Sequence, residues 1–242
     1  MTHITDTYPL QDRIILVTGA GDGLGRAAAL HYAKAGATII LLGKTIGKLE
    51  QVYDEIEAAN GPTPAIYPMN LESANENDYA TLADTIEKEF NILHGILHCA
   101  ATLGALTPLE HYPADLWYKV LQVNLNAAFL LTRTHIPLLK RSANSAVLFS
   151  IDQKSRAYWG AYGVSKAGLL ALVHILADEL DNPEQRIRVN AIDPGPTRTQ
   201  LRSQAYPGDT PDKLTSPEEK MQAYLDLIRP NSTGVNGQLI TL

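Results

Sequence analysis

Residues 17–26, "VTGAGDGLGR", follow a short apolar run and precede an alanine-rich segment. Glycines at 19, 23 and 25 form the pattern Thr-Gly-x-x-x-Gly-Leu-Gly, which predicts a tight turn between a strand and a helix. Bare backbone in such a turn lets a diphosphate approach the helix N-terminus, whose free N–H groups favour anions. No Gly-Lys-Ser/Thr follows, so the turn is not a nucleoside-triphosphate loop. An ordinary tight turn is the alternative, and Asp22 places an acid where an anion is expected.

The glycine turn begins a regular alternation of short apolar runs and helical patterns. Short β-branched runs lie at 13–19, 37–43, 65–71, 94–100, 145–151, 186–192 and 237–242. Helical spacing of apolar residues lies between them, at 24–35, around 49–56, and at 79–90, 115–141 and 161–180. This order predicts an α/β fold with a single Rossmann-type, doubly wound parallel sheet of about seven strands and helices on both faces.

Length and composition indicate one domain. The 242 residues are 45% hydrophobic, which is enough for a substantial core. No repeat or linker is visible, so residues 1–242 are interpreted as one dinucleotide-binding and catalytic domain. The least regular stretch, 197–217, is rich in Pro, Ser, Thr and Asp, and it is expected to form a surface excursion at the substrate.

Charge and cysteine content narrow the expected partners and location. The formal net charge is -6, which leaves no basic footprint for nucleic acid. The N-terminal residues show no apolar signal segment and no run approaches a membrane span, so no membrane partner is expected. Cys99 is the single cysteine, which fits a reducing compartment, and the seven histidines show no metal-binding spacing. These features predict a cytoplasmic protein without a metal.

A second chemical pattern is "AYGVSK", in which Tyr162 and Lys166 are four residues apart. On a helix this spacing places both side chains on one face, one turn apart. A neighbouring ammonium favours the phenolate, which moves the phenol pKa toward the working range of an acid–base catalyst. A surface Tyr and Lys on a solvated helix are the alternative. Ser150 lies at the end of the strand "SAVLF", where open α/β sheets place their ligand sites, and Asn124 lies in "VNLN" of the preceding helical segment.

Taken together, these motifs resemble the short-chain dehydrogenase/reductase family over essentially the whole chain. The matching pieces are "TGAGDGLG", "HCAA", Asn124, Ser150, "YGVSK" and "NAIDPGPTRT", in the order of the family. The segments "WGAYGVSK" and "PGPTRT" are most like a bacterial branch of oxidoreductases within it. The resemblance implies an oxidoreductase that moves hydride between a nicotinamide cofactor and a carbonyl or alcohol substrate.

The resemblance also implies roles for particular residues. Tyr162 would be the general acid–base, and Lys166 would lower its pKa and bind the nicotinamide ribose. Ser150 would polarise the substrate oxygen, and Asn124 would anchor a water in the proton relay. Cofactor contacts are implied for Gly19, Asp22, Gly23, Leu24, Gly25, Lys44, Asn70, Leu71, Cys99, Ala100, Tyr162, Lys166, Pro194, Gly195, Thr197 and Thr199.

The chain departs from the family pattern at several positions. His98-Cys99-Ala100-Ala101 replaces the usual Asn-Asn-Ala-Gly, which removes an amide hydrogen-bonding group and a flexible glycine. Asn70 replaces the usual Asp beside the adenine. The spacing from Ser150 to Tyr162 is one residue shorter than is common in the family, and "IDQKSR" between them is more polar than usual.

The residues after the second predicted strand favour NADP(H) over NAD(H). NAD specificity in this fold normally needs a carboxylate there to accept the ribose hydroxyls. Gly43 offers none, and Lys44 follows at once, able to bind a 2′-phosphate through a charge-assisted hydrogen bond. Asp22 acts in the opposite direction, but it can turn to solvent or cap the first helix turn, where an acid is favoured. NADP(H) is therefore the predicted cofactor, with NAD(H) as the alternative.

The sequence leaves two other functions open, and it also predicts an oligomer. A non-catalytic dinucleotide-binding regulator or scaffold of the same fold is one alternative, because fold alone never implies activity. A methyltransferase is another, although the acid it needs after the second strand is missing at Gly43 and Lys44. The two long helical segments carry more apolar positions than one sheet face needs, which predicts a homodimer or homotetramer.

Overall fold

The computed structural model describes residues 8–232 and 234–242 of the chain. Their centre is a seven-stranded sheet in which all neighbouring strands are parallel, in the order β3-β2-β1-β4-β5-β6-β7. The predicted doubly wound fold is thereby confirmed. The strands are β1 Ile14–Thr18, β2 Thr38–Gly43, β3 Ala65–Pro68, β4 Gly95–His98, β5 Ser145–Ser150, β6 Ile187–Asp193 and β7 Leu239–Thr241. Two predictions from the sequence, a single domain over 1–242 and an N-terminus without a signal segment, involve residues 1–7 and 233. These residues lie outside the described residues.

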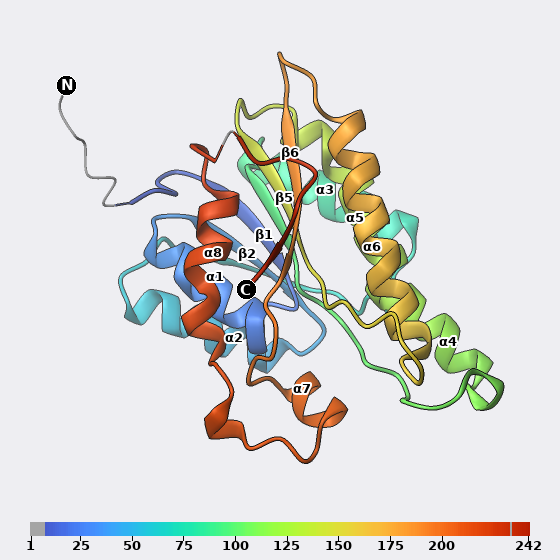
Figure 1. The fold of residues 1–242 in the computed structure, drawn as a ribbon. Coiled ribbons are helices and arrows are strands. Elements are labelled where there is room, and N and C mark those ends of the chain that lie inside the picture. Colours follow the sequence, from blue (N-terminus) through green and yellow to red (C-terminus); the bar gives the residue numbers. More distant parts are fainter. Residues whose placement is uncertain (1–7, 233) are drawn as a thin grey trace.

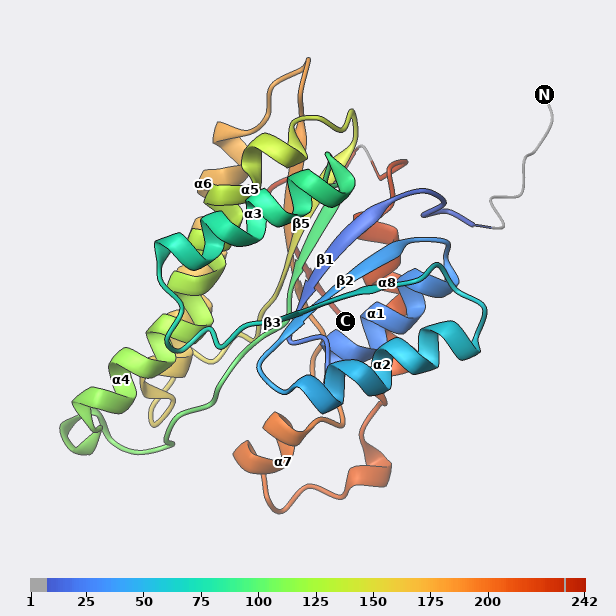
Figure 2. The ribbon, with the colours of Figure 1, turned by 180° about the vertical axis from the view of Figure 1, so that it is seen from behind.

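Helices cover both faces of the sheet, as Figures 1 and 2 show from opposite sides. One face carries α1 (Gly23–Lys34), α2 (Ile46–Ala58) and α8 (Pro217–Ile228). The other carries α3 (Glu76–Phe90), α5 (Ala127–Leu139) and α6 (Gly160–Glu179), and α4 (Ala114–Leu121) packs against α6. Each face has its own cluster of buried apolar side chains, because every central strand is buried on both sides.

The strand order has its switch point at β1, which pairs with β2 on one side and β4 on the other. Connections from β1 run to one side of the sheet and those from β4 to the other, so the loops part at the carboxyl ends of these strands. Open α/β sheets bind ligands in this crevice. Thr18 at the end of β1 is in register with Leu42 and His98 on the two neighbours.

The segment 115–141, predicted as one helical stretch, is interrupted by a wider turn. A π-helical turn, Gln122–Asn126, joins α4 to α5. Such turns insert one residue into the helical ladder and occur frequently at functional sites. Asn124 sits in the middle of this turn, and its side chain is buried.

The excursion at 197–217 is partly ordered into helical turns. It contains α7 (Gln200–Ala205) and a 3-10 turn, Pro211–Lys213, and Figure 1 places α7 beyond the carboxyl ends of the strands. The following helix, α8, was not predicted from the sequence. It begins with a capping box, in which the Ser216 side chain accepts from the Glu219 amide and the Glu219 carboxylate accepts from the Ser216 amide.

One helix, α6, is long and apolar enough to cross a bilayer by length and composition alone. In this fold it packs against β6 and contributes Leu169 and Val173 to the core, so burial explains part of its apolar character.

Candidate functional site

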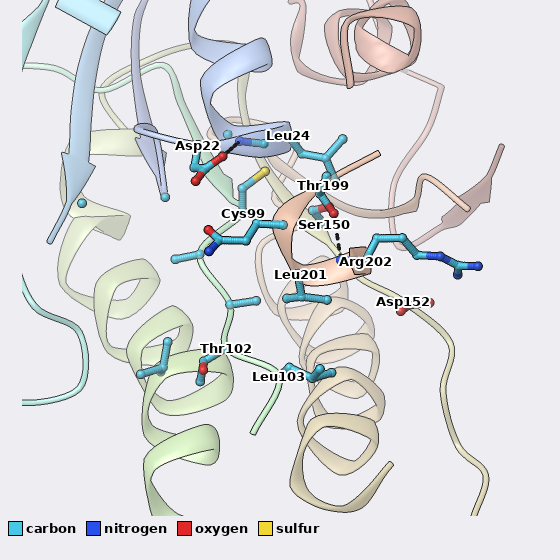
Figure 3. A pocket seen from close by; sticks show the side chains of 18 of the residues that line it. Asp22, Leu24, Cys99, Thr102, Leu103, Ser150, Asp152, Thr199, Leu201 and Arg202 are labelled. Atoms are coloured by element: carbon cyan, nitrogen blue, oxygen red, sulfur yellow. Dashed lines mark hydrogen bonds between the residues drawn. The ribbon is translucent and has the colours of Figure 1, made fainter. Parts of the chain in front are cut away.

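A cavity of about 480 Å³ opens at the carboxyl ends of the strands. It is lined by every predicted site residue except Asn124. Figure 3 shows Cys99, Ser150 and Thr199 gathered beside the start of α1, with Thr102, Leu103 and Leu201 farther along the cavity. The glycine turn and the Tyr-Lys pair, which are far apart in the sequence, therefore face the same space.

The glycine turn fits tightly against the backbone around it. Gly19 has a φ of +67°, and a Cβ there would lie 3.0 Å from the Ala100 backbone. A Cβ on Gly25 would lie 2.3 Å from the Gly19 carbonyl oxygen, so no side chain fits without a backbone shift. The turn leaves the first amides of α1, among them those of Leu24 and Gly25, at the cavity without intrahelical acceptors.

Asp22, the acid in the turn, has two partners. Its carboxylate accepts from the Gly23 amide at 2.7 Å, which caps α1 as the sequence had suggested. It also forms an ion pair with Lys48 in the first turn of α2. The hydrogen bond from Lys48 is the main reason that the pKa of Asp22 is lowered. The Asp22 carboxylate is thus paired with a cation at the cavity.

Lys44 and Lys48 lie at the same rim of the cavity. Lys44 directly follows β2 and is exposed, and Lys48 is four residues further on. Thr45 between them is the N-cap residue of α2, yet its side chain makes no capping hydrogen bond. Asn70 and Leu71, after β3, line the adjoining wall, where the Asn70 side chain accepts from the Glu72 amide at 3.2 Å.

Residues 98–101, at the end of β4, lack the asparagine amides that are usual in the family, and other contacts hold this segment in place. The His98 ring turns into the core, stacks on Phe149 and hydrogen-bonds Thr132 across 2.9 Å. Burial lowers the pKa of His98 to about 3, so the ring is neutral. The Thr18 hydroxyl accepts from the amides of Cys99 and Ala100 at 3.1 and 3.2 Å, which fixes the backbone at the cavity floor.

Cys99 is a cavity-lining thiol without nucleophilic character. Burial raises the pKa of its thiol to about 12, although the Lys166 ammonium and a hydrogen bond from Ser150 act in the opposite direction. A thiol with such a pKa is protonated at neutral pH, and only the thiolate is an effective nucleophile.

Ser150, Tyr162 and Lys166 converge from β5 and α6. All three side chains are buried, and all three line the cavity. Lys166 Nζ donates to the Ser150 main-chain oxygen at 3.0 Å and lies 5.6 Å from the centre of the Tyr162 ring. Burial lowers the pKa of Lys166, opposed by Cys99, Asp152 and Asp193.

The Tyr162 phenol faces a carboxylate. Its hydroxyl donates to Asp152 Oδ2 at 3.4 Å, and Asp152 Oδ1 pairs with Lys154 Nζ at 2.7 Å. Burial, followed by Asp152, raises the pKa of Tyr162 well above its usual value. The sequence had suggested a lowered pKa through Lys166. The geometry differs because the ammonium is directed to the Ser150 carbonyl and the phenol to Asp152.

Asn124 lies behind the main cavity. Its side-chain oxygen accepts from the Thr102 amide at 2.8 Å, and its nitrogen donates to the Thr102 carbonyl at 3.0 Å and to Ser165 Oγ at 3.1 Å. These bonds tie the loop after β4 to α6. Asn124 also lines a void of about 10 Å³ together with Thr18, His98 and Lys166, which is close to the space of one water.

The far side of the cavity comes from β6 and the excursion. Thr197 is buried and donates to the Gly195 carbonyl at 3.1 Å, and Thr199 caps α7 by accepting from the Arg202 amide at 3.2 Å. The wall beyond Tyr162 is apolar and aromatic, and it is formed by Leu103, Trp159, Leu201, Ala205 and Tyr206.

Three residues of this site were not among the site residues predicted from the sequence. The four-residue spacing between Lys44 and Lys48 is visible in the sequence. Only the position of the start of α2 shows that both residues lie at the same rim of the cavity. Asp152 lies in the polar run after Ser150, whose direction the sequence does not define. Tyr224 lies behind Ser150 from a helix that was not predicted, and no local pattern could have found it.

In residues 8–232 and 234–242, no group of three or more His, Cys, Asp or Glu side chains is arranged to hold a metal ion.

The fold, the glycine turn and the Ser-Tyr-Lys arrangement together define a dinucleotide-dependent oxidoreductase architecture. Residues 13–209 match the model of the short chain dehydrogenase family. The chain belongs to the short-chain dehydrogenases.

Several bacterial proteins are similar to this chain. The uncharacterized oxidoreductase YciK of Escherichia coli strain K12 is 42% identical over 231 residues, which cover 94% of this chain and 90% of that protein. A short chain dehydrogenase from Pseudomonas syringae has a TM-score of 0.94 and 45% identity, with 100% of this chain and 98% of that one covered. A short chain dehydrogenase from Shigella flexneri 2a, solved in complex with NADP, has a TM-score of 0.93 and 39% identity over 97% of this chain and 98% of its own.

Proposed function

We propose that this protein is an NADP(H)-dependent oxidoreductase that interconverts a carbonyl compound and its alcohol. The single observation that carries the proposal is the shared cavity, which is lined by the diphosphate-type turn, by two lysines and by Ser150, Tyr162 and Lys166. A regulator that only bound a dinucleotide would not need the three reactive side chains at the far end of the space.

The glycine cradle fits a dinucleotide. The positions where a Cβ would collide, Gly19 and Gly25, are those where a diphosphate must approach the backbone of α1. Leu24 and Gly25 amides would hold its oxygens, and Cys99 and Ala100 would line the adenosine side with Asn70 and Leu71. Pro194, Gly195, Thr197 and Thr199 would hold the carboxamide side. When bound, the cofactor supplies or accepts the hydride.

The rim formed by Lys44 and Lys48 favours NADP(H) over NAD(H). A 2′-phosphate at this rim would contact Lys44 directly. It would also contact the Thr45 hydroxyl, which makes no capping hydrogen bond at the start of α2. Lys48 neutralises Asp22, the acid that would otherwise repel the phosphate. The complex of the Shigella flexneri relative with NADP agrees with this preference.

The residues at the reacting end have complementary tasks. Tyr162 would donate its proton to the carbonyl oxygen during reduction, and its raised pKa keeps the phenol protonated at neutral pH. Ser150 would donate a hydrogen bond to the same oxygen. Lys166 would hold the ribose beside it, and Asn124 would hold a water in the small void next to Lys166, through which a proton could be replaced.

The test is NADPH oxidation in the presence of a panel of ketones and aldehydes. The proposal predicts turnover for at least one member, and turnover that is much weaker with NADH. Tight NADPH binding without turnover across a broad panel would favour the regulator instead.

We also propose a homo-oligomer in the cytoplasm. Exposed apolar side chains lie on α5 and α6, namely Phe129 at 43%, Val164 at 49% and Ile175 at 53% exposure. Two copies of such a face can bury each other in an isologous interface. The single cysteine fits the reducing compartment.

A further inference from the structure

Tyr224 of α8 reaches Ser150 from behind the cavity. Its hydroxyl oxygen lies 2.8 Å from Ser150 Oγ, although the two residues are 74 positions apart. Tyr224 is 0% exposed and does not line the cavity, whereas Ser150 does. The helix that carries Tyr224 covers the face of the sheet opposite to α6, so Ser150 is held from both faces.

The donors and acceptors around the Tyr224 hydroxyl determine the direction of the Tyr224–Ser150 hydrogen bond. Within residues 8–232 and 234–242, Ser150 Oγ is the one hydrogen-bond partner of the Tyr224 hydroxyl. A buried O–H group without an acceptor is costly, so the Tyr224 proton has to go to Ser150. Burial, followed by Cys99 and Asp193, raises the pKa of Tyr224 well above its usual value against the opposing effect of the Ser150 hydrogen bond, so this donor stays protonated.

A serine hydroxyl has one proton to donate and two lone pairs to accept. When Ser150 accepts from Tyr224, its own proton is directed to the cavity side, where the Cys99 sulfur, a weak acceptor, receives it in the structure. If the bond ran the other way, the Ser150 proton would be used inside the protein and only a lone pair would face the substrate. A lone pair repels a carbonyl oxygen, which is itself an acceptor.

We propose that Tyr224 is a positioning residue that donates to Ser150 Oγ and thereby turns the Ser150 proton toward the oxygen of a carbonyl substrate. The proposal rests on the proposed function of Ser150. Lys166 holds the main-chain oxygen of Ser150 while Tyr224 sets the polarity of its side chain.

The chain offers a matched control in Tyr32. Tyr32 is also fully buried in the same apolar cluster, and its hydroxyl donates to the Tyr224 main-chain oxygen at 3.2 Å. Tyr32→Phe therefore removes a buried phenol hydroxyl from the same region without touching Ser150.

Kinetics test the functional consequence, with the carbonyl compound of the panel that gives the fastest turnover as the probe. We expect Tyr224→Phe to lower kcat about tenfold, less than the 10²–10³ lost with an oxyanion donor itself, and to leave the KM for NADPH unchanged. Tyr32→Phe should stay within about twofold of the parent, since it removes no hydrogen bond to the reacting group. In a Ser150→Ala background, Tyr224→Phe should have no further effect on kcat. A parental kcat in Tyr224→Phe, or the same loss in both backgrounds, overturns the proposal.

A second measurement decides the direction of the bond without turnover. In protein labelled with ¹³C at tyrosine Cζ, the buried Tyr224 hydroxyl proton should give a slowly exchanging resonance, assigned by its loss in Tyr224→Phe. Ser150→Ala should shift this resonance, and Tyr32→Phe should not. A resonance that Ser150→Ala leaves in place, or a proton that exchanges too fast to be seen, contradicts the proposal. A panel without turnover would instead contradict the proposed function, so the two failures are distinct.

Discussion

The Tyr162 hydroxyl and the Asp152 carboxylate face each other across 3.4 Å at the reacting end of the cavity. A carboxylate beside a phenol disfavours the phenolate, and with burial it raises the pKa of Tyr162. Protonated Tyr162 is the form that could donate to a carbonyl oxygen, as the proposed reduction requires.

Asp152→Asn should move the pH dependence of reduction. The phenol must be protonated for reduction, so activity is present below its pKa and is lost as the pH rises through it. Removing the carboxylate lowers this pKa, and the alkaline limb of kcat should move to lower pH. The charged and titratable groups around the phenol are Asp152, Asp193, Tyr206 and Lys166. Asp212→Asn, at an exposed carboxylate, is the control, and an unchanged alkaline limb in Asp152→Asn would refute the effect.

The two lysines at the rim should differ in their effects on the cofactors. Lys44→Ala should weaken NADPH binding by about 10- to 100-fold, because a hydrogen bond to a charged group contributes about 1.5–3 kcal/mol, and NADH binding should hardly change. Lys48→Ala leaves the Asp22 carboxylate without its cation and should weaken binding of both cofactors. Fluorescence titration measures these affinities, with the exposed Lys34→Ala as the control. An NADPH to NADH ratio unaffected by Lys44→Ala would contradict the assignment.

The glycine cradle predicts a strong effect of a single methyl group. A Cβ on Gly25 would lie 2.3 Å from the Gly19 carbonyl oxygen, so Gly25→Ala must displace the turn. We expect NADPH affinity to fall by about tenfold or more, since each lost hydrogen bond to a charged phosphate contributes about 1.5–3 kcal/mol. A Cβ on Gly208 would meet nothing within 4 Å, and Gly208→Ala should bind like the parent. Parental binding by Gly25→Ala would show that the diphosphate is held elsewhere.

The proposed interface can be disrupted by a charge. Ile175 on α6 is 53% exposed, and Ile175→Arg should convert the oligomer to monomers, as measured by light scattering. Leu109, in the 3-10 turn Leu109–His111, is 67% exposed, and Leu109→Arg should leave the oligomer intact. A parent protein that is monomeric at micromolar concentration would disprove the oligomer.

The sequence predicted the strands well because each strand of the parallel sheet is a short apolar run, and the five central strands are largely buried. The positions of Ser150, Tyr162 and Lys166 at one cavity followed from strand ends and helical spacing. Long-range pairs were beyond reach. Asp22 and Lys48 are 26 residues apart, and Ser150 and Tyr224 are 74 apart, so no periodicity links them. The start of α8 was not predicted, because Pro217 belongs to the irregular stretch 197–217 in the sequence. In the structure Pro217 lies in the first turn of the helix, where Pro is favoured.

NADPH-dependent carbonyl reduction by the parent and by Tyr162→Phe, with NADPH affinity measured on both, tests the role of Tyr162 as general acid–base. We expect the variant to lose at least about 10²-fold in kcat, the scale of a general acid, and to bind NADPH nearly as tightly as the parent. A Tyr162→Phe variant that reduces the same carbonyl compound at the parental rate would contradict the central claim.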